Sequence, residues 1–522
     1  MKRKIKTALL SVYDKQGITA FAAELRKLDI EIISSGGTWR ILDSEGISAE
    51  KVEDFTKYPE MFGGRVKTLH PRIHGGILAR RNNDKDKLDM AENDIKPIDM
   101  VVVNLYPFKR VVENGSSAEK IIENIDIGGP SMLRSAAKNF KDVAVVTSPE
   151  DYLSLIEEMK ENKGYITEKT RLELAKKAFA MTASYDDFIS RYFSKLDQEN
   201  GEPKSCEHEI LTLQFKRKDI LRYGENPHQK AVYYEDMDQK ENSLAGAVQL
   251  NGKKLSFNNI MDLDAARNIV MDFEMPASSV IKHTNPCGAA VGTSIREAFK
   301  KAHSTDPKSA YGSVVGFNRQ VTADVAEDMR RLYIEAIVAP SFTDEALAVF
   351  KKKKNLRIIA TGDCKTEDRN EKEFKKVSGG LLVEDKDLYI PKKSDFEVVT
   401  ERAPSEDEYA ALELGQRIVR HVKSNAVILT DKYKTVGIGA GQMSRVDALE
   451  LAIKKSLSST EGCIMASDAF FPFRDSIDEA FKAGITAVVQ PGGSIRDTEV
   501  VEACNQHGIS MVFTGKRCFR HL

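Results

Sequence analysis

The sequence predicts an α/β protein with more than one domain, and two observations carry this prediction. Short runs rich in Val and Ile, such as 99–105 and 142–148, are typical of buried parallel strands and alternate with helical patterns. The length of 522 residues favours two to four domains. The formal net charge of −1 provides no global field that would attract nucleic acid, and 41% hydrophobic residues are ordinary for a globular protein.

The first part of the chain alternates strand and helix. Residues 7–12 (TALLSV) predict the first strand, and their direct continuation into a helical pattern argues against a signal sequence. Residues 30–33 predict a second strand, 99–105 and 142–148 two more, and 167–196 a long helix. These elements together predict a sheet with helical crossovers.

Polar stretches predict the domain boundaries. We expect a first domain at 1–197, a linker at 198–209 and a second domain at 210–522. A charged segment at 362–395, with little strand or helix pattern, predicts a break between two sub-domains. After residue 405 the sequence predicts five further strands with helices between them.

Cysteine spacing and hydropathy bound the class of protein. The six cysteines form no C-x-x-C pair, so we expect neither a disulfide framework nor a structural zinc site. This pattern favours a reduced, cytoplasmic compartment. No apolar run approaches the roughly 18–20 residues that would cross a bilayer, so we expect no membrane association.

Two segments of the first domain suggest an anion site. In SSGGT (34–38), a strand ends in small residues before a helix, so backbone N–H groups could hold a phosphate; a plain tight turn is the alternative. The segment 63–81 adds cations among glycines, which suits an anionic small molecule, whereas a solvated basic loop is the alternative. Its basic side chains include Arg65, Lys67, His70, Arg72 and His74.

His70 and His74 also have the i, i+4 spacing of a zinc-binding helix. Pro71 and Gly75 argue against a helix at this position, so we do not expect a metal site.

The segment 125–140 (IDIGGPSMLRSAAKNF) predicts a helix that begins near Ser131 as its cap. The two glycines after Asp126 would offer N–H donors to a developing oxyanion. Lys138 follows Arg134 by one helical turn, so both could lie on one face. Ordinary surface charge is the alternative interpretation.

The segment 280–292 (VIKHTNPCGAAVG) has four possible readings. A deaminase-type zinc site would need H-x-E and P-C-x-x-C, and both are missing. Asn285-Pro-Cys-Gly reads as a turn that buries Cys287, which disfavours a thiol nucleophile. An acid/base pair of Lys282 and His283 at a strand end and a structural histidine both remain.

The last third holds further polar motifs at 422–427, 437–445 and 467–475. The basic and aromatic tail, 514–522, follows a predicted strand directly. Such a tail is usually disordered, but this one could equally return into a site.

As a set, these motifs resemble the bifunctional enzymes of purine biosynthesis that join AICAR transformylase to IMP cyclohydrolase. The resemblance runs along the whole chain in the family's order. It is carried by SVYDK, SSGGT, EMFGGRVKTLHP, NLYPF, IDIGG, AAKN, LRYGENPHQ, KHTNPCGAAVG, GIGAGQMSR, SDAFFPFRD and the Arg-x-Phe-x-His ending.

The resemblance implies a methylglyoxal-synthase-like, Rossmann-type first domain that cyclises formyl-AICAR to IMP without metal or cofactor. The ribose phosphate would be held by Ser11, Lys15, Ser35, Gly37, Thr38, Arg65, Lys67 and Thr68. The reacting end would be surrounded by Asn104, Tyr106, Asp126 and Lys138, with Lys67 also catalytic.

The resemblance also implies a second domain of two cytidine-deaminase-like α/β sub-domains without zinc. It would transfer the formyl group of 10-formyltetrahydrofolate to the AICAR amine. His283 would remove the amine proton with support from Lys282, and Asn425 would orient the formyl group. The nucleotide and folate pockets would be built by Arg222, Tyr223, Arg445, Phe473, Asp475, Arg517, Phe519 and His521.

In this family the transformylase sites lie at a homodimer interface, so the resemblance implies a homodimer with shared sites. It implies no catalytic metal, and it allows a structural potassium ion. The rival functions are a nucleotide-sensing regulatory protein, a zinc-dependent deaminase, and a cyclohydrolase joined to a non-catalytic nucleotide-binding scaffold. The missing zinc motifs argue against the deaminase.

Overall fold

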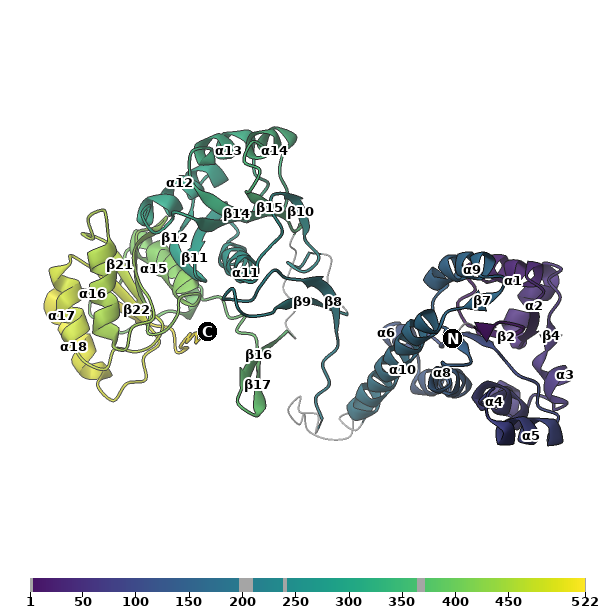
Figure 1. Ribbon diagram of the computed structural model, residues 1–522. Helices are drawn as coiled ribbons and strands as arrows, with labels where there is room; N and C mark the ends of the chain where they lie inside the picture. Colours follow the sequence, from purple (N-terminus) through teal and green to yellow (C-terminus); the bar gives the residue numbers. More distant parts are fainter. Residues whose placement is uncertain (1–2, 197–209, 238–241, 364–370, 522) are drawn as a thin grey trace. The chain divides into compact units, whose positions relative to one another are not determined.

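The computed structural model describes residues 3–196, 210–237, 242–363 and 371–521 (Figure 1). The chain forms two compact units, Met1–Gln214 and Phe215–Leu522. The predicted linker, 198–209, lies outside the described residues.

Residues 210–214, which we expected at the start of the second domain, belong to the first unit. Two side chains of the long helix that precedes the linker explain this difference. Arg191 donates a hydrogen bond to the carbonyl of Thr212, and Gln214 donates one to Asp187.

The first unit is built on a five-stranded parallel sheet with the strand order β4-β3-β2-β5-β6. The strands are β2 (Thr7–Val12), β3 (Glu31–Ser34), β4 (Glu50–Lys51), β5 (Met100–Asn104) and β6 (Ala144–Val146). Their apolar side chains are buried, as expected for a parallel sheet covered on both faces. The four strands predicted in this part of the sequence are confirmed.

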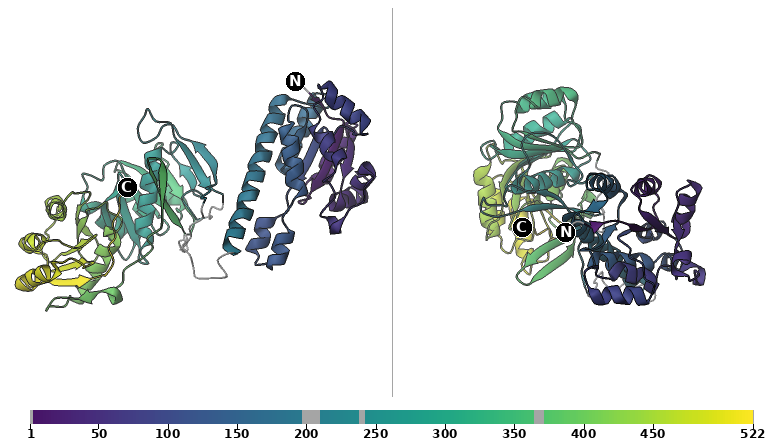
Figure 2. Two further views of the ribbon diagram at one scale, coloured as in Figure 1. Left: turned by 90° about the horizontal axis from the view of Figure 1, so that it is seen from below. Right: turned by 45° about the vertical axis from the view of Figure 1, so that its right-hand side comes forward.

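Helices cover both faces of this sheet (Figure 2). They are α1 (Ile18–Lys27), α2 (Gly36–Ser44), α3 (Val52–Thr56), α4 (Pro71–Leu78), α5 (Asp84–Glu92), α6 (Phe108–Glu113), α7 (Ala118–Glu123), α8 (Gly128–Lys138), α9 (Tyr152–Glu161) and α10 (Glu168–Leu196). Helix α8 packs on β5 and β6, and α10 covers α8. The strands β1 (Arg3–Lys4) and β7 (Tyr165–Ile166) form a separate antiparallel pair.

Helix α4 contradicts our expectation that Pro71 and Gly75 exclude a helix. Pro71 occupies the first helical position, where its missing N–H has no intrahelical partner to lose. The ring of His70 accepts a hydrogen bond from the N–H of Arg72 and so caps the helix. Gly75 permits close packing, because a Cβ there would lie 2.8 Å from Ile95.

The second unit contains two six-stranded sheets with equivalent strand orders, which the sequence did not reveal as a repeat. The first is β10-β15-β14-β13-β11-β12 and the second is β18-β23-β22-β21-β19-β20. In each sheet both edge pairings are antiparallel, and the two central pairings are parallel. The segment 362–395, where we predicted a break, lies between these sheets in the sequence.

The strands of both sheets follow the order of the sequence. The first sheet holds β10 (Val248–Asn251), β11 (Ala277–Lys282), β12 (Asn285–Val291), β13 (Ser313–Phe317), β14 (Ile334–Ala339) and β15 (Arg357–Ala360). The second holds β18 (Glu397–Val398), β19 (Val427–Thr430), β20 (Thr435–Gly439), β21 (Ile464–Ser467), β22 (Ala487–Gln490) and β23 (Ser510–Phe513). The five strands predicted after residue 405 are β19 to β23 and are confirmed.

Two helices, α11 (Phe257–Met271) and α15 (Glu406–Val419), contribute with both sheets to one shared apolar core. The outer faces carry two further sets of helices with their own cores (Figure 1). One set is α12 (Ile295–Thr305), α13 (Ala323–Met329) and α14 (Asp344–Phe350); the other is α16 (Arg445–Lys455), α17 (Asp475–Lys482) and α18 (Asp497–His507). Throughout the described ranges, every helix falls short of the length and apolar character needed to cross a membrane.

The charged segment 362–395 has more structure than its composition predicted. In its described part, β16 (Lys372–Val377) and β17 (Gly380–Asp385) form an antiparallel hairpin. Ion pairs across the hairpin, including Lys375 with Glu384, explain how so polar a sequence forms strands. A second hairpin joins β8 (Phe215–Ile220) and β9 (Val232–Asp236).

Helix α16 approaches β20 so closely that Gly439 has no room for a side chain. A Cβ at this position would lie 1.8 Å from the carbonyl oxygen of Ala448. We therefore expect Gly439→Ala to lower the free energy of unfolding of the second unit by about 1–3 kcal/mol, as overpacking does. Equilibrium urea unfolding measures the change.

Gly380→Ala is the control, because a Cβ there would meet only Val377, at 3.5 Å. Equal stability of the two variants would contradict this packing.

Candidate active sites

The loops that follow β2, β3 and β5 line a cavity of about 670 Å³ in the first unit. The carboxyl ends of these parallel strands meet at one edge of the sheet, which is where such sheets bind ligands. The predicted residues that line this cavity are Ser11, Lys15, Ser35, Gly37, Thr38, Arg65, Lys67, Thr68, Asn104, Tyr106 and Asp126. The structure therefore brings together all residues assigned to the cyclohydrolase site except Lys138.

The predicted phosphate cradle forms where β3 leads into α2. Ser35 precedes the helix, and its hydroxyl lies 3.1 Å from that of Ser11. The hydroxyl of Thr38 is engaged internally, because it accepts from the N–H of Val12 and donates to the carbonyl of the same residue. Thr38 therefore fixes the cradle, while the glycine N–H groups at the start of α2 suit an anion.

The two principal cations of the cavity are paired with carboxylates that the sequence did not point to. Lys67 lies 2.9 Å from Glu60, and Arg65 forms a two-pronged ion pair with Glu123. The Arg65 pair is exposed, so it contributes little stability, and a bound phosphate could compete for the guanidinium. Burial lowers the pKa of Lys15 at the floor of the same cavity.

Asp126 and Tyr106 lie on the other side of the cavity from the cradle segments in sequence, after β5. The Asp126 carboxylate accepts hydrogen bonds from the N–H groups of Gly129, at 2.8 Å, and of Tyr106. Burial raises the pKa of Asp126, and burial together with the Asp126 charge raises the pKa of Tyr106. The Gly129 N–H, which we expected to face an oxyanion, is thus used by Asp126.

Helix α8 also begins earlier than predicted. It starts at Gly128, and Ser131 lies within its first turn, donating to the carbonyl of Ile127 instead of capping the helix. Gly128 tolerates this early start because it packs closely on Thr68, whose hydroxyl would lie 2.8 Å from a Cβ.

Asn104 and Lys138 have different surroundings from those predicted. The Asn104 amide accepts from the N–H groups of Tyr13 and Asp14 and donates to the carbonyl of Asp14, so it holds the loop after β2. Lys138 ends α8, about 15 Å along the helix from Gly128, and lines a separate cavity with Arg80. Its placement beside Asp126 is not supported within this chain.

In the second unit, His283 and Thr284 form the two-residue turn of the hairpin β11–β12. Both have positive φ, 52° and 60°, as a type I′ turn requires, although neither is glycine. Asp262 of α11 accepts a hydrogen bond from the Thr284 N–H at 2.7 Å and secures the turn. The His283 side chain is exposed, while the Lys282 ammonium donates to the carbonyls of Tyr311 and Gly312.

Lys282 and His283 line a cavity of about 290 Å³. Cys287 lines it too, but in strand β12, which corrects our expectation of a turn there. Burial raises the pKa of the Cys287 thiol to about 12, so the thiolate is scarce at neutral pH. These surroundings favour a structural role for Cys287 over a nucleophilic one.

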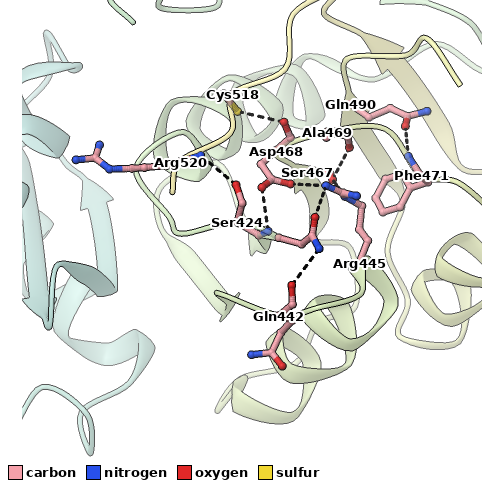
Figure 3. A network of polar contacts seen from close by, with 12 residues as sticks. Ser424, Gln442, Arg445, Ser467, Asp468, Ala469, Phe471, Gln490, Cys518 and Arg520 are labelled. Atoms are coloured by element: carbon pink, nitrogen blue, oxygen red, sulfur yellow. Dashed lines mark hydrogen bonds and ion pairs between the residues drawn. The ribbon is translucent and has the colours of Figure 1, made fainter. Parts of the chain in front are cut away.

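Asn425 belongs to a buried polar network (Figure 3). Its side-chain oxygen accepts from Arg445 at 3.1 Å, and its amide donates to the carbonyls of Gln442 and Met443. Arg445 also forms a 2.7 Å ion pair with Asp468. Arg445 is therefore buried behind Asn425, where it can orient that residue more readily than it can contact a nucleotide.

The C-terminal tail is ordered along this network. The Cys518 N–H donates to the carbonyl of Asp468, and the backbones of Ser424 and Arg520 are joined through Ser424 N–H and Ser424 hydroxyl contacts. Asn285, next to the His283 turn, accepts from the N–H of Lys423 at 3.1 Å. The turn, the Asn425 segment and the tail thus lie side by side.

The other predicted residues of this unit remain apart within one chain. Arg222 stacks over Tyr223 in the loop between β8 and β9, and Phe473 lies under Arg496 before α17. Asp475 begins α17, Arg517 stacks over Phe519, and the His521 ring lies 5.6 Å from that of Phe519. Arg517 lines a cavity of about 300 Å³ that does not include His283.

The described residues contain no cluster of three or more His, Cys, Asp and Glu side chains that could hold a metal ion. At the helical His pair, the His70 ring bonds to the Arg72 N–H, and the His74 ring lies 3.1 Å from the Ser135 hydroxyl. Each ring therefore has a protein partner.

Cys287 provides a direct test of the second site. With a pKa near 12 and a buried side chain, its thiol should resist iodoacetamide at pH 8, since only the thiolate reacts. Peptide mass spectrometry of the native and the urea-unfolded chain measures this protection. Rapid native alkylation at Cys287 would restore it as a candidate nucleophile.

Known proteins share this organisation. The AICARFT/IMPCHase bienzyme family matches residues 136–455, and the MGS-like domain family matches residues 17–131. The bifunctional purine biosynthesis protein PurH of Halalkalibacterium halodurans is 47% identical over 522 residues, with 100% of both chains covered. PurH of Persephonella marina is 48% identical, covering 99% of this chain and 100% of its own. The crystal structure of ForH is 35% identical over 36% of this chain and 99% of that chain, with a TM-score of 0.33. This chain belongs to the family of bifunctional purine biosynthesis proteins that combine AICAR transformylase and IMP cyclohydrolase.

Proposed function

We propose that the two activities are divided between the two units, with ring closure in the first and formyl transfer in the second. The observation that carries this division is the cavity of the first unit, which gathers eleven of the twelve residues assigned to ring closure. Its cradle, paired cations and buried carboxyl suit a phosphorylated substrate with a reacting amide.

Ring closure needs a proton acceptor and proton donors. The carboxamide nitrogen attacks the formyl carbon, loses a proton as the C–N bond forms, and the formyl oxygen leaves as water after gaining two protons. The buried Asp126 carboxylate is placed to accept the nitrogen proton. Lys67 and Tyr106 border the same cavity and are suited to stabilise and protonate the departing oxygen. Lys138 has no assigned role in this scheme.

For the second unit we propose that the exposed His283 imidazole removes the amine proton as AICAR attacks the formyl carbon. The C–N bond to the folate then breaks, and the folate nitrogen takes up a proton. Lys282 holds the turn through two carbonyls, and Asn425, oriented by Arg445, polarises the formyl group. Asn425 is linked to the turn through the contact between Asn285 and Lys423.

The formyl donor in this proposal is 10-formyltetrahydrofolate, as the transformylase family implies. We further propose that the two equivalent sheets are cytidine-deaminase-like sub-domains that carry no zinc. Their shared strand order supports a duplication. The remaining lysine, arginine and aromatic residues would bind nucleotide and folate.

A homodimer would explain why Arg222, Phe473 and Arg517 do not meet His283 within one chain. We propose that a second chain completes each transformylase site and that the enzyme acts in the cytoplasm. A structural potassium ion would be a further expectation of the resemblance, and we assign no residues to it.

The competing proposal is a cyclohydrolase attached to a non-catalytic scaffold. The strained turn at His283 favours catalysis, because two non-glycine residues with positive φ are held there by a dedicated carboxylate, Asp262. A purely structural hairpin would more readily use Asn-Gly.

Paired substitutions test the division of labour. Asp126→Asn should reduce the cyclisation of formyl-AICAR at least about 100-fold, the usual scale for a lost general base, and leave formyl transfer to AICAR unchanged. His283→Ala should do the reverse. Absorbance assays of each half-reaction measure both activities in the same preparations.

Loss of both activities in either variant would contradict the division. Formyl transfer that survives His283→Ala would favour the scaffold.

A further inference from the structure

A tyrosine outside the cavity holds the segment that carries Asp126. The Tyr185 hydroxyl, on helix α10, accepts a hydrogen bond from the Asp126 N–H at 2.9 Å. The same hydroxyl donates to the carbonyl of Asn124 at 3.1 Å. It therefore closes a bridge across the turn from Asn124 to Asp126, and both of these residues line the cavity.

The phenol is suited to this bridge because it stays protonated. Burial raises the pKa of Tyr185 to about 12, so the O–H remains available to the Asn124 carbonyl throughout the neutral range. The other restraint on this segment, the exposed pair of Glu123 and Arg65, is weak by comparison.

The same helix also supports the opposite wall of the reacting end. Phe108 is fully buried and packs edge-to-face against Tyr185 and Tyr192 of α10. The Phe108 N–H donates to the carbonyl of Tyr106 at 2.8 Å. Helix α10 therefore contacts the supports of both Tyr106 and Asp126.

We propose that Tyr185 is a positioning residue for ring closure, which acts through the backbone of Asp126 without contacting the substrate. This inference rests on the proposed role of Asp126. Tyr185 stands outside the set of residues that line the cavity, so its loss should change the placement of the carboxylate more than substrate affinity.

Tyr185→Phe removes the hydroxyl and keeps the ring. The Asp126 N–H and the Asn124 carbonyl then lose their partner, and the segment can shift toward water. We expect kcat for cyclisation to fall about tenfold, KM to change less than about twofold, and formyl transfer to stay unchanged.

The pH profile gives a readout that a general loss of stability would not produce. If Asp126 acts as a carboxylate, the rate falls as the pH decreases through its raised pKa. Greater hydration of the loosened segment would bring this pKa back toward its usual value. The acidic limb of the profile should therefore move to lower pH in Tyr185→Phe.

Tyr192→Phe is the matched control, since it removes a hydroxyl from the same helix and the same aromatic cluster. It should retain wild-type kcat and the wild-type acidic limb. IMP binding by calorimetry shows that the first unit of each variant is folded. If Tyr185→Phe does not bind IMP, a ring-fluorinated tyrosine at 185 replaces it, and its activity should fall at the pH where the more acidic phenol ionises.

The outcomes separate this inference from the proposed function. If Asp126→Asn abolishes cyclisation but Tyr185→Phe matches Tyr192→Phe in kcat and in pH profile, the positioning role is wrong and the proposed function stands. If Asp126→Asn retains cyclisation, the role of Asp126 is wrong and the positioning role falls with it. A selective fall in kcat with a shifted limb supports both.

Discussion

The arrangement of the second unit depends on one buried ion pair, Arg445 with Asp468, whose side chains are 8% and 0% exposed. Asp468 also accepts the Ala426 N–H through its carboxylate and the Cys518 N–H through its carbonyl. The pair therefore joins the start of α16, the end of β21, the Asn425 segment and the C-terminal tail. Removing one partner of such a pair typically costs about 3–5 kcal/mol, because the other charge is left buried and alone.

The two units solve the problem of presenting polar groups in different ways. The first uses the carboxyl edge of a parallel sheet, where several loops meet and backbone N–H groups are available. The second places His283 in a turn whose backbone is strained, and Asp262 compensates by binding the turn. In both units the groups nearest the substrate are held by others just outside the cavity, such as Asn104 and Arg445.

Much of this could be predicted from the sequence, because burial and local chemistry decide it. Val- and Ile-rich runs became strands, and the small residues of SSGGT became the entry to α2. Helix α4 was missed because two helix-breaking residues occupy positions where they do no harm, at the first turn and at a tight contact. Cys287 was placed in a turn because Asn-Pro is a turn signal, whereas the true turn is His283-Thr284.

Other features lie beyond sequence reasoning because they depend on contacts between distant segments. Nothing near Glu123 indicates that it will pair with Arg65, and Tyr185 is one of several half-buried aromatics on a long helix. Lys138 shows the converse error, since a motif residue close in sequence to Asp126 is separated from it by the length of α8. The repeat of two sheets is equally hidden, because equivalent strands share a fold and little sequence.

The central claim is that the phosphorylated product of ring closure binds in the first unit. Hydrogen–deuterium exchange of the full chain with and without IMP tests it most directly. Protection should appear in peptides that span 34–38, 63–68 and 124–129, which contribute residues to the 670 Å³ cavity, and the His283 turn should be nearly unaffected. Protection confined to the second unit would contradict the assignment of ring closure to the first.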